Sequence, residues 1–398
     1  MADPLLTGPW LTIIGIGEDG LAGLSDASRK ALREAEVVFG GERHLQLAEV
    51  GKRGRPWPVP FDVAPVLSCR GRSTAVLASG DPFWHGAGGT LAAHLSAGEW
   101  IAHPAPSTFS LAAARLGWRL EDVNCLGLHA APFERLVPLL AHGTRIICLV
   151  RDAQAACDLA AWLTARGWGA SRLRTLSALG GPRERIGESR AERFAADATA
   201  SPLAVALQAE GTAGLPRSSG LADDLFAHDG QITKRPVRAL ALSALAPRPG
   251  EALWDIGAGS GSISIEWALA GATATAIEAR DDRAANIRAN AAAFGLSHRI
   301  SIVTGHAPAA LEGLKTPDAV FFGGGLDAAL FDAVWMRLGQ GTRVVAHAVT
   351  LETEALLSDL QYAHGGEMMR IELAHAAPLG RYRSWQAARP VVQWSAVK

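Results

Sequence analysis

Three glycines at alternate positions, beginning two residues after an acid, are the residues whose types and spacing point most clearly to chemistry. Asp255 lies near the end of an apolar run, and Gly257, Gly259 and Gly261 follow before a helical pattern begins. Glycine lacks a side chain, so a ligand can lie against its main chain, and the helix end offers unpaired N–H groups. Glu278 ends the next apolar run, about 20 residues past the first glycine, where an acid suits two ribose hydroxyls. The pattern predicts an adenosine-bearing cofactor across this turn.

The spacing of these glycines distinguishes between cofactors. A dinucleotide-binding turn reads G-x-G-x-x-G and holds a pyrophosphate at the helix end. Here the third glycine comes one residue early, as G-A-G-S-G. That spacing, with an acid before it and another after the next strand, is similar to that of the S-adenosylmethionine (SAM) methyltransferases. A nicotinamide dinucleotide and an ordinary turn that binds nothing remain the alternatives.

A second set of turns follows apolar runs in the first third of the chain. Gly15 and Gly17 belong to the stretch G-I-G-E-D-G, whose two acids would repel a pyrophosphate. Gly80 and Asp81 form a sharp turn before a proline. Ser107 precedes a helical pattern that its hydroxyl can cap. Three strand ends with polar or glycine tips therefore fall in this region.

Two further stretches are candidates for holding a substrate. Gln231, Thr233 and Lys234 put donors just before the glycine-rich strand, although Thr233 alternatively only caps the helix that follows. Gly323 and Gly324 end a later strand, at a place where many SAM enzymes that methylate amines carry N/D-P-P-Y/F. Because no amine-orienting group is offered there, we expect carbon methylation of a flat substrate that lies on glycine backbone.

Alternating strands and helices must position these turns. Residues 221–398 contain five strands alternating with helices and a closing pair near 368–374 and 390–396. This pattern predicts a Rossmann-like α/β domain with a mostly parallel sheet covered on both faces. Residues 1–210 also follow an α/β pattern, and the Gly-, Ser- and Pro-rich stretch 211–220 predicts a linker between two domains.

Composition argues against several classes of protein. The 398 residues carry a formal net charge of -1, which gives no bulk attraction to nucleic acid or to an acidic membrane. Four scattered cysteines without C-x-x-C argue for a reducing compartment and against a structural metal site. No signal peptide is visible and no apolar run reaches the length of a bilayer span. We expect a cytoplasmic homo-oligomer without metal, nucleic-acid or membrane partners.

Taken in order, the motifs resemble two known families. The first domain resembles the two-lobed tetrapyrrole (precorrin) methylases, on the stretches 15–20, 79–82, 104–111 and 180–186. The second resembles the small SAM-binding precorrin methyltransferase-decarboxylases, on 231–234, 257–261, Glu278 and 305–308. The resemblance covers nearly the whole chain. One departure is that many tetrapyrrole methylases have G-x-G-P-G-D where this chain has G-I-G-E-D-G.

The resemblance implies a fused enzyme of cobalamin (vitamin B12) synthesis, with a tetrapyrrole substrate and SAM as cofactor. Such an enzyme would methylate precorrin-6B at C5 in its first domain and at C15 in its second, and release the ring C acetate carboxyl as CO2 to give precorrin-8. A dinucleotide-dependent oxidoreductase remains the alternative, and the neutral charge opposes an RNA methyltransferase. No acid or base is assigned, because His306 is either a general base or a structural loop residue.

The turns and the resemblance together define the predicted site residues. The cofactor-binding residues of the second domain are Thr233, Gly257, Ala258, Gly259, Ser260, Gly261, Glu278, Gly305 and Ala307. Those of the first domain are Gly15, Gly17, Gly80, Asp81 and Ser107. The predicted substrate-binding residues are Gln231, Lys234, Gly323 and Gly324.

Overall fold

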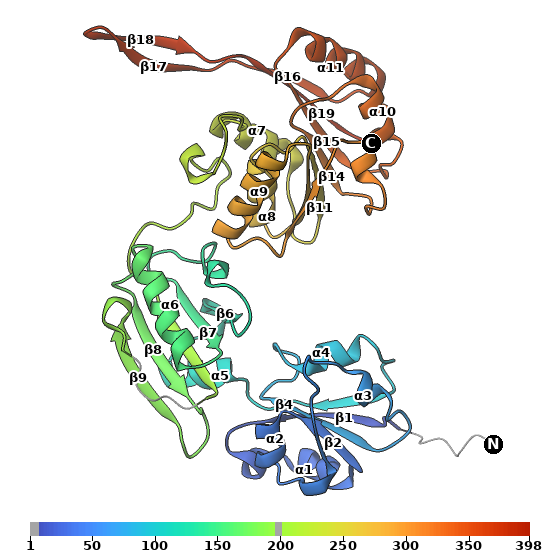
Figure 1. Cartoon of the computed structure of the whole chain (residues 1–398), viewed down its shortest axis with the longest axis vertical. Coiled ribbons are helices and arrows are strands. Elements are labelled where there is room, and N and C mark those ends of the chain that lie inside the picture. Colours follow the sequence, from blue (N-terminus) through green and yellow to red (C-terminus); the bar gives the residue numbers. More distant parts are fainter. Residues whose placement is uncertain (1–7, 196–200) are drawn as a thin grey trace, which may run out of the picture. The chain divides into compact units, whose positions relative to one another are not determined.

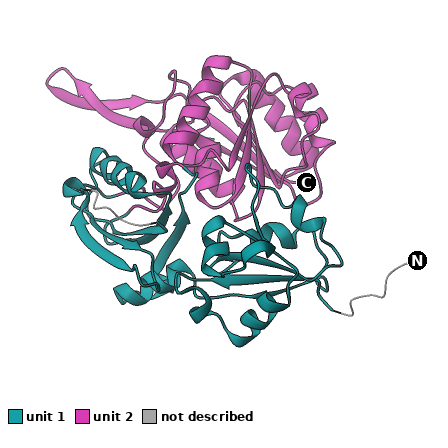
Figure 2. Ribbon diagram, turned by 60° about the horizontal axis from the view of Figure 1, so that its bottom comes forward, with its two compact units in different colours: residues 1–131, 141–213 teal, residues 132–140, 214–398 magenta. Residues whose placement is uncertain are grey.

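The computed structural model describes residues 8–195 and 201–398, and its contacts divide the chain into two compact units (Figure 2). Unit 1 comprises Met1–Ala131 and Ala141–Ala213, and unit 2 comprises Pro132–Leu140 and Gly214–Lys398. The division after Ala213 falls inside the expected linker, but the grouping of Pro132–Leu140 with unit 2 departs from two contiguous domains. The domain boundaries stay a prediction. Residues 1–7, on which the expectation about a signal peptide rests, lie outside the described residues.

The first lobe of unit 1 is a parallel five-stranded sheet of order β3-β2-β4-β1-β5 (Figure 1). Its strands are β1 (Leu11–Ile16), β2 (Val37–Gly40), β3 (Gly54–Pro56), β4 (Thr74–Ser79) and β5 (Trp100–His103). Its helices are α1 (Asp26–Glu34), α2 (Glu42–Leu47), α3 (Ala64–Leu67) and α4 (Ala87–Ala92). Nearly every residue of β1 and β4 is buried, as in parallel strands covered on both faces. The turns named above lie at the carboxyl ends of these strands.

The second lobe of unit 1 is a mixed sheet of order β6-β7-β10-β8-β9. Its strands are β6 (Val123–Gly127), β7 (Arg145–Val150), β8 (Arg172–Ser177), β9 (Arg185–Arg190) and β10 (Leu203–Gln208), and its helices are α5 (Thr108–Leu116) and α6 (Ala153–Ala165). β10 is antiparallel to both β7 and β8, whereas β6 and β7 are parallel. The exposed edge strand β9 begins inside the charged stretch 180–186.

Unit 2 is built on a seven-stranded sheet of order β13-β12-β11-β14-β15-β19-β16. The strands are β11 (Ala252–Ile256), β12 (Thr273–Glu278), β13 (Ile300–Thr304), β14 (Ala319–Phe322), β15 (Arg343–Ala348), β16 (Glu367–Ile371) and β19 (Val391–Val397). The helices are α7 (Arg235–Leu245), α8 (Ser262–Leu269), α9 (Asp281–Ala293), α10 (Ala328–Trp335) and α11 (Leu351–His364). The first five strands of the order are parallel, and β19 is antiparallel to β15 and β16.

Both faces of this sheet are covered by helices. Leu253, on β11, packs with residues of α7, α8 and α9 in one buried cluster. Its neighbour Trp254 packs with residues of α10 and α11 in another. Successive residues of a strand point to opposite faces, so a strand buried on both faces is apolar throughout. The predicted α/β fold of this half, with a mostly parallel sheet between two helical layers, is therefore confirmed.

A hairpin that the sequence analysis did not foresee extends from this sheet (Figure 1). β17 (Ala374–Leu379) and β18 (Tyr382–Ala387) pair only with each other and lie between β16 and β19 in the chain. Leu379, Tyr382 and Trp385 are 65%, 67% and 75% exposed. A two-stranded hairpin has two unpaired edges, and this one also exposes apolar side chains. Proteins usually cover both kinds of surface.

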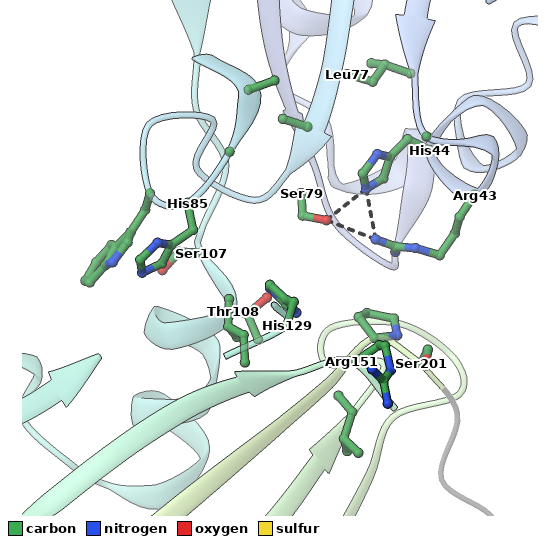
Figure 3. A pocket seen from close by; sticks show the side chains of 18 of the residues that line it. Arg43, His44, Leu77, Ser79, His85, Ser107, Thr108, His129, Arg151 and Ser201 are labelled. Atoms are coloured by element: carbon green, nitrogen blue, oxygen red, sulfur yellow. Dashed lines mark hydrogen bonds between the residues drawn. The ribbon is translucent and has the colours of Figure 1, made fainter. Parts of the chain in front are cut away.

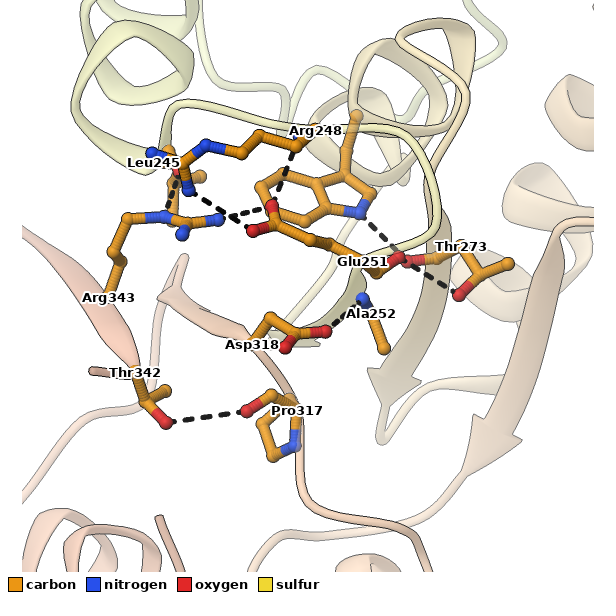
Figure 4. Close-up of polar contacts among 10 residues, drawn as sticks. Leu245, Arg248, Glu251, Ala252, Thr273, Pro317, Asp318, Thr342 and Arg343 are labelled. Carbon is orange, nitrogen blue, oxygen red and sulfur yellow. Dashed lines mark hydrogen bonds and ion pairs between the residues drawn. The ribbon is translucent and has the colours of Figure 1, made fainter. Parts of the chain in front are cut away.

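The amino-terminal edge of the sheet is held by a group of polar contacts (Figure 4). Arg343, on β15, donates from Nε to the carbonyl of Leu245 at the end of α7 (2.6 Å) and pairs with Glu251. Arg248 also pairs with Glu251, with 3.1 Å between Nη1 and Oε1. These contacts fasten the connection between α7 and β11 to the middle of the sheet. They fix the position of the start of β11. The position of its carboxyl end, where the glycine turn begins, is fixed with it.

Candidate cofactor and substrate sites

The glycine turn of unit 2 requires glycine for two physical reasons. Gly257, Gly259 and Gly261 have φ values of +71°, +58° and +71°, which other residues rarely adopt. A Cβ on Gly257 would lie 2.7 Å from the carbonyl oxygen of Gly324, and one on Gly261 would lie 2.8 Å from Cγ2 of Ile287. The turn therefore packs directly against the end of β14 and against α9. Its outer surface is left as bare main chain.

Glu278 lies at this turn and is buried, with 5% exposure. Its Oε2 accepts from the N–H of Gly259 (2.8 Å) and its Oε1 accepts from the N–H of Arg280 (3.0 Å). A carboxylate has about four acceptor positions, so two remain for hydroxyl groups. Glu278 is therefore a buried acid with two open acceptor positions, and not an acid at a solvated strand end. Its role toward a ribose stays a prediction.

Two buried polar atoms beside the turn lack a hydrogen-bond partner among the described residues. They are Oδ1 of Asp255 and Oγ of Ser260. Burial, and to a smaller extent the charge of Glu278, raises the pKa of Asp255 to about 6, although bonds from Ser264 partly offset this. Native proteins pair nearly all buried polar atoms. Orphaned polar atoms, bare glycine backbone and a buried acid are together the features that fit a polar, ribose-bearing cofactor such as SAM.

The segment 228–234 passes over the glycine turn. The carbonyl oxygen of Gln231 lies 3.5 Å from the position that a Cβ on Gly259 would take. α7 begins at Arg235, with Lys234 as its N-cap and no side-chain capping bond, so the alternative that Thr233 merely caps this helix is wrong. Lys234 is exposed, and its Nζ lies 3.9 Å from Oδ2 of Asp223. The segment therefore offers its polar groups next to the turn.

The remaining predicted residues of unit 2 lie on the loops that leave neighbouring strands. Gly305 donates its N–H to the carbonyl of Glu278 (2.9 Å), which places the loop of Ala307 beside the end of β12. Gly323 donates to the carbonyl of Ile256 (2.9 Å), and Gly324 contacts Gly257 as described. The predicted residues therefore gather at the carboxyl edge of the parallel strands, where open α/β sheets bind ligands.

The predicted glycines of unit 1 bring three strand ends together. A Cβ on Gly15 would lie 1.8 Å from the carbonyl oxygen of Gly80 and 2.5 Å from the amide nitrogen of Ala105. A Cβ on Gly17 would lie 2.6 Å from Oδ1 of Asp19. The ends of β1 and β4 and the loop after β5 therefore touch through main chain alone, which only glycine permits.

The two polar residues predicted in unit 1 both shape turns. Asp81 accepts from the N–H of Phe83 (2.9 Å), which fixes the turn after β4. Ser107 is the N-cap of α5 and accepts from the N–H of Ser110 (3.0 Å). Its buried side chain also lines a large cavity. Cofactor binding by either residue stays a prediction.

The cavity of unit 1 has a volume of about 610 Å³ and combines aromatic and basic walls (Figure 3). The aromatic residues that line it are Trp57, Phe61, Trp84 and Phe109, and the basic ones are Arg43, His44, His85, His129 and Arg151. No carboxylate lines it within the described part of the chain. Gly17 and Gly80 line a smaller hollow together with Arg43 and Ser79. The large cavity suits a flat apolar molecule that carries negative groups.

The sequence analysis missed the polar group at the wall of this cavity. Nη2 of Arg43 donates to Oγ of Ser79 (2.9 Å) and to Nε2 of His44 (2.9 Å), and Ser79 Oγ lies 2.8 Å from the same Nε2 (Figure 3). Arg43 also pairs with buried Glu18, which Arg183 contacts at 3.2 Å. Burial, and then the charge of Arg43, lowers the pKa of His44 to about 4, so its ring is neutral. The sequence offered one signal that could have identified these residues, which is their position: Arg43 closely follows the end of β2, and Ser79 ends β4.

Buried polar residues on the helices of unit 2 were also missed. Arg238, fully buried on α7, donates to Oε1 of Glu266 (2.6 Å) and Oδ1 of Asp223 (3.0 Å). Glu266 on α8 accepts in turn from the N–H groups of Gly220 (2.6 Å) and Leu221 (2.9 Å). The pair fastens the start of unit 2 to the helix behind the glycine turn. A charged residue inside an apolar helical pattern was the signal that could have found it.

Two classes of site were searched for over the described residues. No group of three or more His, Cys, Asp or Glu side chains is placed to hold a metal ion there. No helix among them is both long and apolar enough to cross a membrane.

Comparison with known proteins gives matches over both halves of the chain. Residues 10–195 match the model of the tetrapyrrole (corrin/porphyrin) methylases, and residues 224–398 match that of the precorrin methyltransferase domain. A precorrin-6Y C(5,15)-methyltransferase [decarboxylating] of a Sinorhizobium species is 46% identical over 407 residues, covering 100% of this chain and 98% of the relative.

Two shorter relatives also match. A probable cobalt-precorrin-6B C(15)-methyltransferase (decarboxylating) of Pyrobaculum calidifontis is 36% identical and covers 43% of this chain and 92% of the relative. The crystal structure of the C-terminal domain of precorrin-6Y C5,15-methyltransferase from Rhodobacter capsulatus is 56% identical, with a TM-score of 0.46, and covers 46% of this chain and 100% of that one.

Proposed function

The chain belongs to the family of the precorrin-6Y C(5,15)-methyltransferases (decarboxylating), and from this premise we propose a division of labour between its two units. The activity is SAM-dependent methyl transfer with decarboxylation in cobalamin biosynthesis. Unit 1 methylates the precorrin at C5. Unit 2 methylates it at C15 and removes the carboxyl of the ring C acetate. The substrate of the complete reaction is precorrin-6B and its product is precorrin-8.

The observation that carries the proposal is that each unit has its own glycine turns at strand ends. Those of unit 1 adjoin a cavity with aromatic and basic walls, and those of unit 2 adjoin a buried acid and orphaned polar atoms. When bound, SAM supplies a methyl group attached to a sulfonium sulfur. After the transfer, the rest of the cofactor leaves as a neutral thioether. The protein therefore has mainly to align the substrate carbon and exclude water.

In unit 1, aromatic side chains give a flat macrocycle apolar surface, while Arg43 and Arg151 attract its carboxylates. Methylation of a meso carbon forms one C–C bond and releases the proton of that carbon. His129 lines this cavity, and burial lowers the pKa of its ring, although a hydrogen bond with the main chain of Val150 opposes the change. This geometry supports methylation at C5 in unit 1.

In unit 2, the proton released by methylation equals in number the proton taken up after decarboxylation. Methylation at C15 releases one proton, and loss of CO2 leaves an electron pair on the former acetate carbon that takes one up. The conjugated ring can hold this pair, so the protein has to orient the acetate out of the ring plane. The shorter relative named for both C15 methylation and decarboxylation supports assigning the two steps to one unit.

Mass spectrometry of the tetrapyrrole after incubation with SAM tests the proposal. We expect two methyl gains and one loss of CO2 per substrate molecule. Calorimetry with S-adenosylhomocysteine should approach two molecules bound per chain. A single methyl gain, or one S-adenosylhomocysteine per folded chain, would contradict a methylation site in each unit.

The hairpin of β17 and β18 supports the further proposal that the chain forms a homo-oligomer. Its strands pair with no other strand of the described chain, and its large apolar side chains are exposed. The same hairpin of a second copy would cover these edges, and this contact would need no other surface of the chain. Sedimentation of Trp385→Ser should then show smaller particles than the wild type. Tyr362→Ser, which changes a 96% exposed aromatic residue on α11, serves as the matched control and should sediment like the wild type.

The cysteines support placing the reaction in the cytoplasm. Cys69, Cys125, Cys148 and Cys157 are all free thiols. Unpaired cysteines persist in reducing compartments. Secretion of the active enzyme with any of these thiols oxidised would contradict this location.

A further inference from the structure

A buried amide on α9 contacts both sides of the proposed SAM site of unit 2. The side chain is that of Asn290, which is 2% exposed. Its Nδ2 donates to the carbonyl of Ser260 (2.9 Å) and to that of Ala227 (3.0 Å), and its Oδ1 accepts from the N–H of Ala227 (2.8 Å). Three of its four hydrogen-bonding positions are therefore used, and all three partners are main-chain atoms.

The two stretches that this amide joins face each other. Ser260 belongs to the glycine turn, and Ala227 directly precedes the segment 228–234. The carbonyl of Gln231 in that segment lies 3.5 Å from the Cβ position of Gly259. The distance between turn and segment therefore sets how much room a molecule has between them.

The same face of α9 holds these stretches at further points. Arg283, two turns before Asn290, donates from Nε to Oδ2 of Asp229 (2.9 Å). Ile287, one turn before Asn290, packs against Gly261. Side chains three and four residues apart lie on one helix face, so α9 is a common support for turn and segment. Asn290 is the member of this face that bonds to both.

We propose that Asn290 is a positioning residue that sets the spacing between the glycine turn and the segment of Gln231, and thereby the affinity of unit 2 for SAM. The inference rests on the proposed function, because it needs SAM to bind across this turn. The amide is planar and short, so a shift of either stretch would break its hydrogen bonds and leave polar atoms of this buried side chain unpaired. The width of the site is therefore built into the free protein.

The substitution Asn290→Asp separates this role from simple packing. It keeps the shape and one acceptor, removes both N–H donors, and sets a carboxylate against the carbonyls of Ser260 and Ala227. We expect S-adenosylhomocysteine to bind unit 2 at least tenfold more weakly in the full chain, while the site of unit 1 is unchanged. The KM for SAM in C15 methylation should rise, whereas kcat at saturating SAM should stay within threefold.

A measurement without ligand tests the positioning directly. In the free full-length protein, amide hydrogen exchange should become faster at both 227–231 and 258–261 in Asn290→Asp. Ala289→Asp adds the same charge at the neighbouring exposed position of α9 and should change neither exchange nor affinity. If Asn290→Asp does not fold, Asn290→Ala, which removes the amide without adding a charge, takes its place in each measurement.

The outcomes distinguish the inference from the function on which it rests. One S-adenosylhomocysteine per wild-type chain, bound in unit 1, would contradict SAM binding by unit 2 and overturn both. Two per wild-type chain with less than a threefold change in Asn290→Asp would overturn the inference alone. Equal weakening in Ala289→Asp, or faster exchange spread evenly over unit 2, would reduce Asn290 to a stability residue and would also overturn it.

Discussion

At the scale of single residues, the two proposed sites differ in how they treat charge. Unit 2 keeps two acids at its turn, and burial holds the pKa of one of them, Asp255, at about 6. Unit 1 lines its cavity with arginines and histidines, and buried Glu18 forms ion pairs with Arg43 of this wall and with Arg183. An acid suits the hydroxyls of a cofactor, whereas cations suit the carboxylates of a substrate. These charges fit the proposal that the acids of unit 2 contact the cofactor and that the arginines of unit 1 contact the tetrapyrrole.

Glu278→Ala tests the acid of unit 2. Hydrogen bonds to a charged group contribute roughly 1.5–3 kcal/mol, so losing the ribose contacts should weaken SAM binding about 10-fold to 100-fold. The N–H groups of Gly259 and Arg280 also lose their acceptor, which loosens the turn in the same direction. Calorimetry on the full chain measures the effect, with exposed Asp281→Ala as the control. A change of less than threefold would remove Glu278 from the site.

At this scale, a residue could be predicted from the sequence where its role depends on neighbouring residues in the chain. Gly257 and Gly261 were predictable because alternate glycines after a strand have a local meaning. Asn290 was not, because its partners lie 30 and 63 residues away in the chain and an asparagine on a helix is commonly exposed. Arg43 was missed for the same reason, since its partners Glu18 and Ser79 meet it only after three strands have assembled.

At the scale of elements, both units bring strand ends into direct main-chain contact. In unit 2 the end of β11 meets the end of β14 at Gly257 and Gly324, and in unit 1 the end of β1 meets that of β4 at Gly15 and Gly80. Close approach of backbones leaves no room for a Cβ, so these positions control the register of the loops above them. The loops carry the predicted ligand-binding groups, and the strand ends fix the positions of these loops.

Gly257→Ala tests this control. The new Cβ would lie 2.7 Å from the carbonyl oxygen of Gly324, and the residue would have to keep a φ of +71°. Left-handed backbone alone costs an alanine roughly 1 kcal/mol, and the clash adds to it because main chain cannot rotate away. We expect unit 2 to lose S-adenosylhomocysteine binding while unit 1 keeps its own.

Gly250→Ala is the matched control for this prediction. Gly250 also has a positive φ, of +86°, but nothing lies within 4 Å of its Cβ position. The control should therefore lower stability by the backbone term alone and leave binding intact. Equal binding in both variants would show that the contact between Gly257 and Gly324 does not shape the site.

The elements themselves were mostly predictable. Alternating apolar runs and helical patterns identified the parallel strands of unit 2, because strands buried on both faces are apolar throughout. The hairpin of β17 and β18 was missed because Trp385 and Tyr382 are exposed, so no buried face marks the pair. β9 was not predicted, because it is exposed and its residues, among them Arg185, Glu188 and Arg190, show no apolar pattern.

At the scale of the whole molecule, each unit contains a histidine whose pKa lies well below its ordinary value. Burial, and then the charge of Arg43, lowers the pKa of His44 to about 4. Burial lowers that of His347 to about 4 as well, although its bond to Gln393 (3.0 Å) opposes the change. Unfolded imidazoles take up a proton near pH 6.5. Between the two values the unfolded chain binds more protons than the folded one, so both units lose stability as the pH falls.

Denaturant unfolding at pH 7 and pH 5 measures this loss. We expect a decrease of roughly 2 kcal/mol from buried His347, and less from half-buried His44. His347→Gln should flatten the pH dependence of unit 2 and leave that of unit 1 unchanged. An unchanged slope in His347→Gln would contradict this source of acid sensitivity.

The short stretch Pro132–Leu140 has a consequence for how the protein is made. It lies in the chain between β6 and β7 of unit 1, yet its contacts group it with unit 2, and its Leu136 and Leu140 are buried. Domains generally fold in the order in which the ribosome releases them. This stretch therefore emerges before the rest of unit 2, and its contacts with that unit can form only after the rest has been translated.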